Sequence, residues 1–88
     1  MSNAFPVDVK SNFPVRVCHA DDSREQVIIT ASDDFPLYWG RDRRIKAGML
    51  GHKILKGETF SITEATAKGE VYLIAQVGEE ATAAVMEV

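Results

Sequence analysis

The stretch KGEVYLIAQVGE, residues 68–79, decides the fold class of this chain. Two glycine–acid turns bound an apolar run whose alternate residues fall on one side of an extended backbone: Val71, Leu73, Ala75 and Val77. A period of two is typical of a β-strand. A third turn of the same kind, KGE at 56–58, precedes this stretch, so the three turn glycines are 12 and then 9 residues apart. That spacing indicates successive short strands, and glycine suits such turns because it adopts positive φ without a Cβ clash.

Alternating or β-branched runs predict further strands elsewhere in the chain, over residues 13–19, 25–31, 35–39, 59–63 and 82–88. Helix signals are weak, because Gly48 and Gly51 interrupt the segment 45–55, and each glycine costs a helix about 1 kcal/mol relative to alanine. A single helical turn is expected from Thr63, as its cap, to Lys68. The sequence therefore predicts six to eight short antiparallel strands with little helix.

Composition limits the classes of protein that remain. The chain has 88 residues, 45% of them hydrophobic and 26% charged, which is typical of one globular domain. Cys18 is the only cysteine, so no disulfide can form within the chain. The longest apolar runs are far shorter than a membrane span. No basic stretch followed by an apolar one opens the sequence, so we expect no secretory leader. We therefore expect a protein made and kept in a cytosol, with no membrane partner.

Metal-ligand side chains occur around Cys18 and His19, with Asp21 and Asp22 close behind and His52 further along. Neighbouring strand residues point to opposite faces, so Cys18 and His19 cannot easily bind one ion together. We interpret Cys18 as buried, His19 as exposed, and the aspartates as part of a turn. No nucleophile elbow, glycine-rich phosphate loop or paired-carboxylate motif is present. The prediction is a protein that is not an enzyme, with no metal and no cofactor.

The charged residues are unevenly distributed. Residues 41–56 hold six lysines and arginines against the single Asp42, whereas the rest of the chain carries 4 basic and 12 acidic side chains. Tyr38 and Trp39 precede this basic loop, so a small binding module for single-stranded nucleic acid or for a glycan is one interpretation. The overall net charge of −3 disfavours nucleic acid. A basic loop on an acidic body instead favours an acidic protein surface, which includes another copy of the chain. The candidate partner interface consists of Trp39, Arg41, Arg43, Arg44 and Lys46.

The order of elements from residue 27 to residue 88 resembles a known family. A β-branched strand (VIITA) is followed by an aromatic strand ending in glycine (FPLYWG), a variable loop, and the segment GHKILKGE at 51–58. A strand VYLIA and a terminal strand ending VMEV complete the pattern. This order resembles the small β-sandwich structural proteins of tailed bacteriophages, of the capsid decoration, cement or head-fibre type. The chain departs from the pattern in its basic loop and in Lys56, where a proline is common.

The resemblance implies an antiparallel β-sandwich of jelly-roll type that serves as a structural component of the virion, assembled in the host cytoplasm. It further implies self-association, with a homotrimer favoured, and contact with the major capsid protein or another virion protein. The first 26 residues have no counterpart in the pattern, so they either add strands or form an arm that reaches a neighbouring subunit. We set residues 1–12 apart as an N-terminal segment or arm and place the sandwich domain over residues 13–88.

Overall fold

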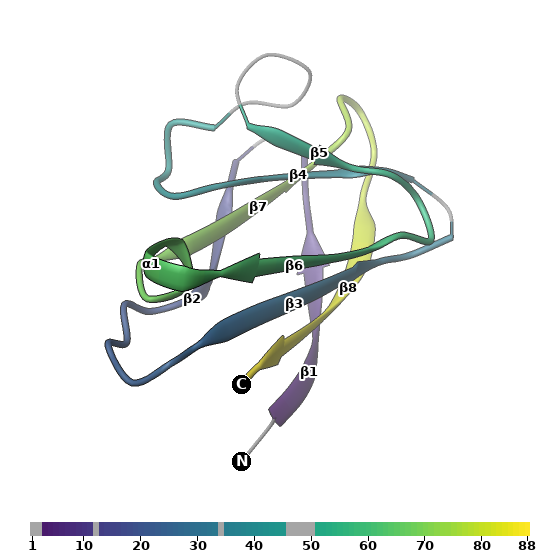
Figure 1. The fold of residues 1–88 in the computed structure, drawn as a ribbon. Helices are drawn as coiled ribbons and strands as arrows, with labels where there is room; N and C mark the ends of the chain where they lie inside the picture. The colour runs from purple at the N-terminus through teal and green to yellow at the C-terminus, as the bar shows by residue number, and fades with distance from the viewer. Residues whose placement is uncertain (1–2, 12, 34, 46–50) are drawn as a thin grey trace.

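Two four-stranded antiparallel sheets make up the structure, a computed structural model that describes residues 3–11, 13–33, 35–45 and 51–88. Sheet A has the strand order β1 (Asn3–Val9), β8 (Ala81–Glu87), β3 (Gln26–Ala31) and β6 (Thr59–Thr63). Sheet B has the order β2 (Val15–Cys18), β7 (Val71–Ala75), β4 (Leu37–Gly40) and β5 (His52–Ile54). Figure 1 shows β3 between β6 and β8, and β4 between β5 and β7. The predicted antiparallel β-sandwich is confirmed.

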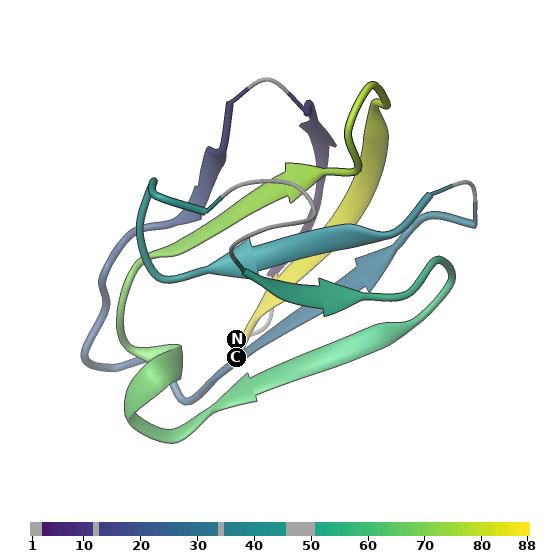
Figure 2. The same ribbon diagram turned by 90° about the horizontal axis from the view of Figure 1, so that it is seen from above.

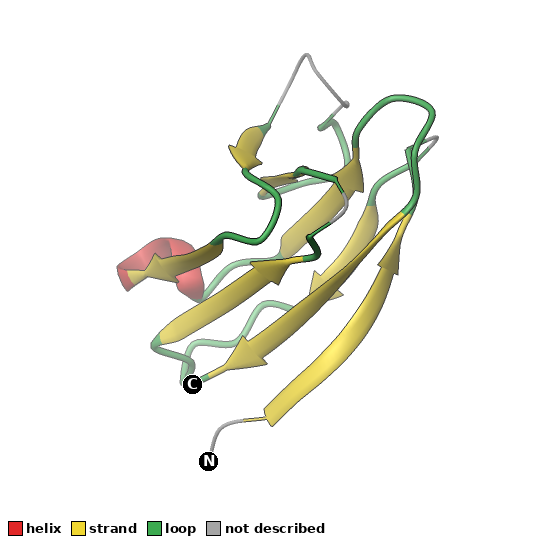
Figure 3. Cartoon of the chain, turned by 90° about the vertical axis from the view of Figure 1, so that its right-hand side faces the viewer, coloured by secondary structure: helices red, strands yellow, loops and turns green. Residues whose placement is uncertain are grey.

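The strands pair in a nested order. The first strand pairs with the last, β2 with β7, β3 with β6, and β4 with β5, always antiparallel. The β1–β8 register sets Asn3 opposite Glu87, and the start of β1 accordingly lies close to the end of β8 in Figures 1 and 2. Figure 3 shows in red the only helix among the described residues, the single turn α1 (Glu64–Ala67) that follows β6. None of the described helical residues forms a segment long and apolar enough to cross a membrane.

The core lies between the sheets and follows from the period-two pattern. Val27 and Ile29 of β3 and Val85 of β8 are fully buried. The residues that alternate with them along each strand are more exposed. Sheet B contributes Leu37 and Leu73, both also fully buried. Burying a large aliphatic side chain stabilises the fold by about 1.5–3 kcal/mol. The alternation therefore fixes which face of each sheet points inward.

Part of the segment that was set apart from the sandwich domain forms a strand of the sandwich. Residues 3–9 form β1, an edge strand of sheet A along the whole length of β8. Phe5 and Val7 pack against the core and Val9 is fully buried, whereas Pro6 and Asp8 are exposed. Of the two alternatives, an added strand or an arm, residues 3–9 form an added strand.

Two further sequence expectations are corrected by the backbone. Gly57 and Gly78 adopt positive φ, 74° and 80°, as a glycine turn requires, but Gly69 does not. Gly69 instead closes the turn after α1, where its N–H donates to the carbonyl of Thr66. Val77, expected to continue the inward face of β7, lies beyond the end of that strand and is 70% exposed.

Candidate protein-binding surface

The basic loop that follows β4 is attached to the outer face of sheet B. Ile45 is 7% exposed and packs on Tyr72 and Ile74 of β7, with Tyr38 of β4 alongside. A Cβ at Gly40 would overlap the Ile45 side chain, so glycine at this position lets the loop turn back closely. This second cluster explains why all five residues of β7 are buried, because Ile45 covers the face of the sheet that points away from the main core.

Three arginines project from this anchored loop into solvent. Arg41, Arg43 and Arg44 are all exposed. Asp42 accepts hydrogen bonds from the Arg44 backbone N–H, at 2.8 Å, and from Arg44 Nη2, at 2.9 Å. These bonds hold the pKa of Asp42 below its ordinary value. Arg41 and Arg43 thus present their charge outward, while part of the Arg44 charge is balanced locally. Lys46, the remaining predicted interface residue of the loop, lies outside the described residues.

Trp39 lies in the core, which corrects its predicted place on the binding surface. Trp39 is 6% exposed. His52 stacks on the indole at a ring-centroid distance of 4.8 Å, and Phe60 from the opposite sheet lies 5.7 Å away. A ring covered in this way offers no open platform for a base or a sugar. The predicted strand with Gly40 at its end is confirmed, and Tyr38 remains half-buried beside Ile45.

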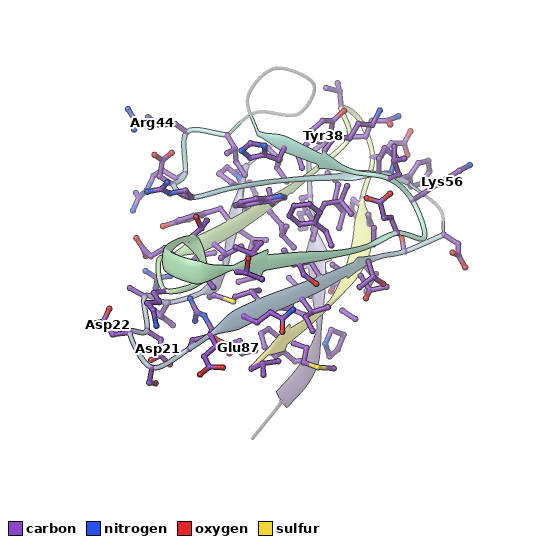
Figure 4. All side chains as sticks on the ribbon, in the orientation of Figure 1. Asp21, Asp22, Tyr38, Arg44, Lys56 and Glu87 are labelled. Carbon is purple, nitrogen blue, oxygen red and sulfur yellow. The ribbon has the colours of Figure 1, made fainter. Side chains whose placement is uncertain are left out.

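A shallow groove opens at the other end of the β4–β5 hairpin. Its volume is about 610 Å³, and it is lined by Phe35, Pro36, Lys53, Leu55, Lys56 and Gln76. Leu55 is 54% exposed, which is unusual for a large apolar side chain. Figure 4 shows Arg44 and Lys56 at opposite ends of this hairpin. The positive charges of residues 41–45 and 51–56, the described parts of this segment, are therefore divided between two places.

The structure also shows a buried charge that the sequence analysis missed. Arg24 is 4% exposed and donates hydrogen bonds to three carbonyl oxygens and one carboxylate: His19 O, Ala67 O, Gly69 O and Glu87 Oε1. These acceptors belong to the segment after β2, the turn around α1, and strand β8. One guanidinium thus joins three segments that are far apart in the chain. No local motif marks this position, because its acceptors are mostly backbone carbonyls.

The residues considered as metal ligands do not form a site in the part of the chain that the structure describes. No group of three His, Cys, Asp or Glu side chains there could hold a metal ion. Cys18 is 2% exposed and His19 is exposed, as interpreted from the sequence. Burial raises the pKa of the Cys18 thiol to about 11, with a further contribution from Glu87. Asp21 accepts hydrogen bonds from the Ser23 hydroxyl and backbone N–H, which lower its pKa.

Comparison of the chain with protein-family models, with curated proteins and with solved structures gives no match. The candidate surface therefore rests on the geometry of the described residues alone. It consists of the anchored basic loop at one end of sheet B and the apolar groove with two lysines at the other.

Proposed function

We propose that this chain is a non-enzymatic structural protein of a bacteriophage virion, which decorates or stabilises the capsid through protein–protein contacts. The resemblance of residues 27–88 to small phage structural proteins suggests the setting. The nested pairing of the eight strands supports the finer assignment of the sandwich to the jelly-roll type, an architecture that capsid proteins use. Self-association, with a homotrimer favoured, is part of the proposal.

The observation that carries the proposal is the attachment of the basic loop. A free loop would lose conformational entropy on binding, at about 1–2 kcal/mol for each ordered residue. Ile45 already holds its end of the loop against Tyr72 and Ile74, so Arg41 and Arg43 are presented close to a fixed position. Such a surface suits a partner of opposite charge, because complementary potentials guide orientation and register. The partner that we propose is an acidic patch of the major capsid protein or another virion protein.

The test is binding to capsid shells assembled from the coat protein of the genome that encodes this chain. We expect the purified protein to sediment with the shells through a sucrose gradient and to raise the temperature at which they dissociate. The Arg43→Glu variant should bind about tenfold more weakly or worse, because an attraction between opposite charges becomes a repulsion between like charges. Lys10→Glu, the same charge change at an exposed residue at the end of β1, serves as the control. Absence of binding by the folded wild-type protein, or equal loss in both variants, would contradict the proposal.

A further inference from the structure

The groove at the end of sheet B combines an exposed apolar floor with positive charge. Leu55 is 54% exposed, and Phe35 and Pro36 lie beside it. Lys53 and Lys56 supply two ammonium groups, and no acidic side chain is among the described residues that line the groove. A ligand that fits this surface carries an apolar group next to carboxylates.

The chain carries such a group at the turn between β7 and β8. The Glu79 N–H donates to the Gln76 carbonyl at 2.9 Å, and Gly78 at the tip has a φ of 80°. Val77 projects from this turn with 70% of its surface exposed, and Glu80 is also exposed. The turn therefore presents an apolar side chain that is followed, after Gly78, by two carboxylates.

We propose that the groove of one copy binds the β7–β8 turn of a second copy of this chain. Val77 of the second copy would cover Leu55, and Glu79 and Glu80 would approach Lys53 and Lys56. Gln76 both lines the groove and begins the turn, so the two halves of the contact adjoin on one surface. Closed symmetry can then repeat the contact, twice in a two-fold pair or three times in a three-fold ring.

This inference deepens the self-association in the proposed function and rests on that part alone. The interface is small, because one exposed valine and one exposed leucine supply its apolar centre. Exposed ion pairs contribute little each, about 0–1 kcal/mol. We therefore expect reversible association whose extent depends on protein concentration and decreases at high salt, where the charges are screened.

Sedimentation equilibrium of charge-reversed variants tests the proposal. The double variants Lys53→Glu/Lys56→Glu, which reverses the groove, and Glu79→Lys/Glu80→Lys, which reverses the turn, should each associate with themselves about tenfold more weakly or worse. Mixing the two variants in equal amounts should restore association between unlike copies. The acidic groove of the first variant then meets the basic turn of the second, and the basic groove of the second meets the acidic turn of the first. The variant with all four changes should associate with itself again. Glu25→Lys, a charge reversal at an exposed residue just before β3 of sheet A, should associate as the wild type does.

Circular dichroism first establishes that each variant is folded. A lower average molar mass in sedimentation equilibrium then reports on the interface. A wild-type protein that stays monomeric as its concentration is raised would overturn the proposal, and so would a mixture that fails to associate. Wild-type-like association of either double variant would also overturn it. The capsid assay tests Arg43 and needs no contact between copies, so either proposal can fail while the other stands.

Discussion

Arg24 and Glu87 form an ion pair of 2.7 Å although 63 residues of chain separate them. The Arg24 side chain is 3% exposed and that of Glu87 35%, so the guanidinium is buried while the carboxylate reaches the surface. Figure 4 shows Glu87 beside the turn that carries Asp21 and Asp22. This pair fixes the last strand to the loop between β2 and β3.

Replacing Arg24 should destabilise the fold strongly. Arg24→Ala leaves three carbonyl oxygens and a carboxylate without their donor, and breaking a buried ion pair costs about 3–5 kcal/mol. Arg16→Ala is the matched control, because Arg16 pairs with Glu70 on the surface, with side chains 44% and 39% exposed, and should cost about 0–1 kcal/mol. Urea unfolding followed by circular dichroism measures both. If Arg24→Ala does not fold, Glu87→Gln provides the comparison and should cost more than Glu70→Gln.

Shortening Ile45 should release the basic loop from sheet B. A buried isoleucine truncated to alanine costs about 2–5 kcal/mol in a closed core, and we expect the lower end here because the site lies on the outer face of a sheet. Trypsin should cut the Ile45→Ala variant faster in the basic loop than it cuts the wild type. Phe13→Ala, at a side chain that is 53% exposed, should change neither property. Unchanged cleavage in the Ile45 variant would show that the anchor does not hold the loop.

Cys18 should make stability depend on alkaline pH. Burial raises its pKa from an ordinary 9.0 to about 11, so the folded state holds the thiol proton more tightly than the unfolded state. The contribution of the protonated Cys18 thiol to the free energy of unfolding is fully present below pH 9 and is lost as the pH rises through 11. The lost amount is about 2–3 kcal/mol, at 1.36 kcal/mol for each unit of pKa. The unfolding free energy of Cys18→Ala, measured by urea titration from pH 8 to pH 11, should fall less steeply than that of the wild type.

The two glycine turns before β7 and β8 should respond differently to alanine. Gly78 has positive φ, so Gly78→Ala should cost about 1–2 kcal/mol in backbone strain even though no atom lies within 4 Å of the added Cβ. Gly69 lacks positive φ, and its nearest contact would be 3.8 Å from the Cβ. Gly69→Ala should therefore be neutral, or stabilise the fold by about 0.4–1 kcal/mol. Thermal unfolding of the pair measures the difference, and equal shifts in Tm would contradict this explanation.

Trp39, the only tryptophan, should report on folding and remain insensitive to ligands that stack on exposed rings. Its emission should be blue-shifted, protected from iodide, and shifted to the red only on unfolding, because the indole is buried beneath His52 and Phe60. Addition of a single-stranded oligonucleotide or an oligosaccharide should leave the spectrum unchanged. Quenching by the oligonucleotide that weakens as salt is added would instead support a nucleic-acid-binding module.

The sequence predicted the strands whose residues alternate in polarity or are rich in β-branched side chains. Run 59–63 coincides with β6, in which Phe60 and Ile62 alternate with hydroxyl residues. Run 25–31 contains β3 and was predicted from its β-branched residues. The prediction missed β5, which is only three residues long and is held by its pairing with β4. It also missed β1, because Pro6 lies inside the alternating pattern and proline argues against a central strand. An edge strand such as β1 tolerates proline.

The candidate surface was less predictable because it depends on tertiary contacts. The charge of the loop is visible in the sequence, but its attachment requires Ile45 to meet Tyr72 and Ile74 from a distant strand. Trp39 next to three arginines suggested a binding surface, whereas the register of β4 turns its ring inward. Leu55 and Val77 read as ordinary apolar positions, and only the fold leaves them exposed near Gln76.

The pairing of Asn3 with Glu87 has a practical consequence for engineering. Adjacent strands lie about 4.8 Å apart, so a short glycine-rich linker could join the two ends without disturbing either sheet. Circular permutants could then be opened at the exposed turns, and a fluorescent or affinity domain fused at either original end would emerge from the same corner of the molecule.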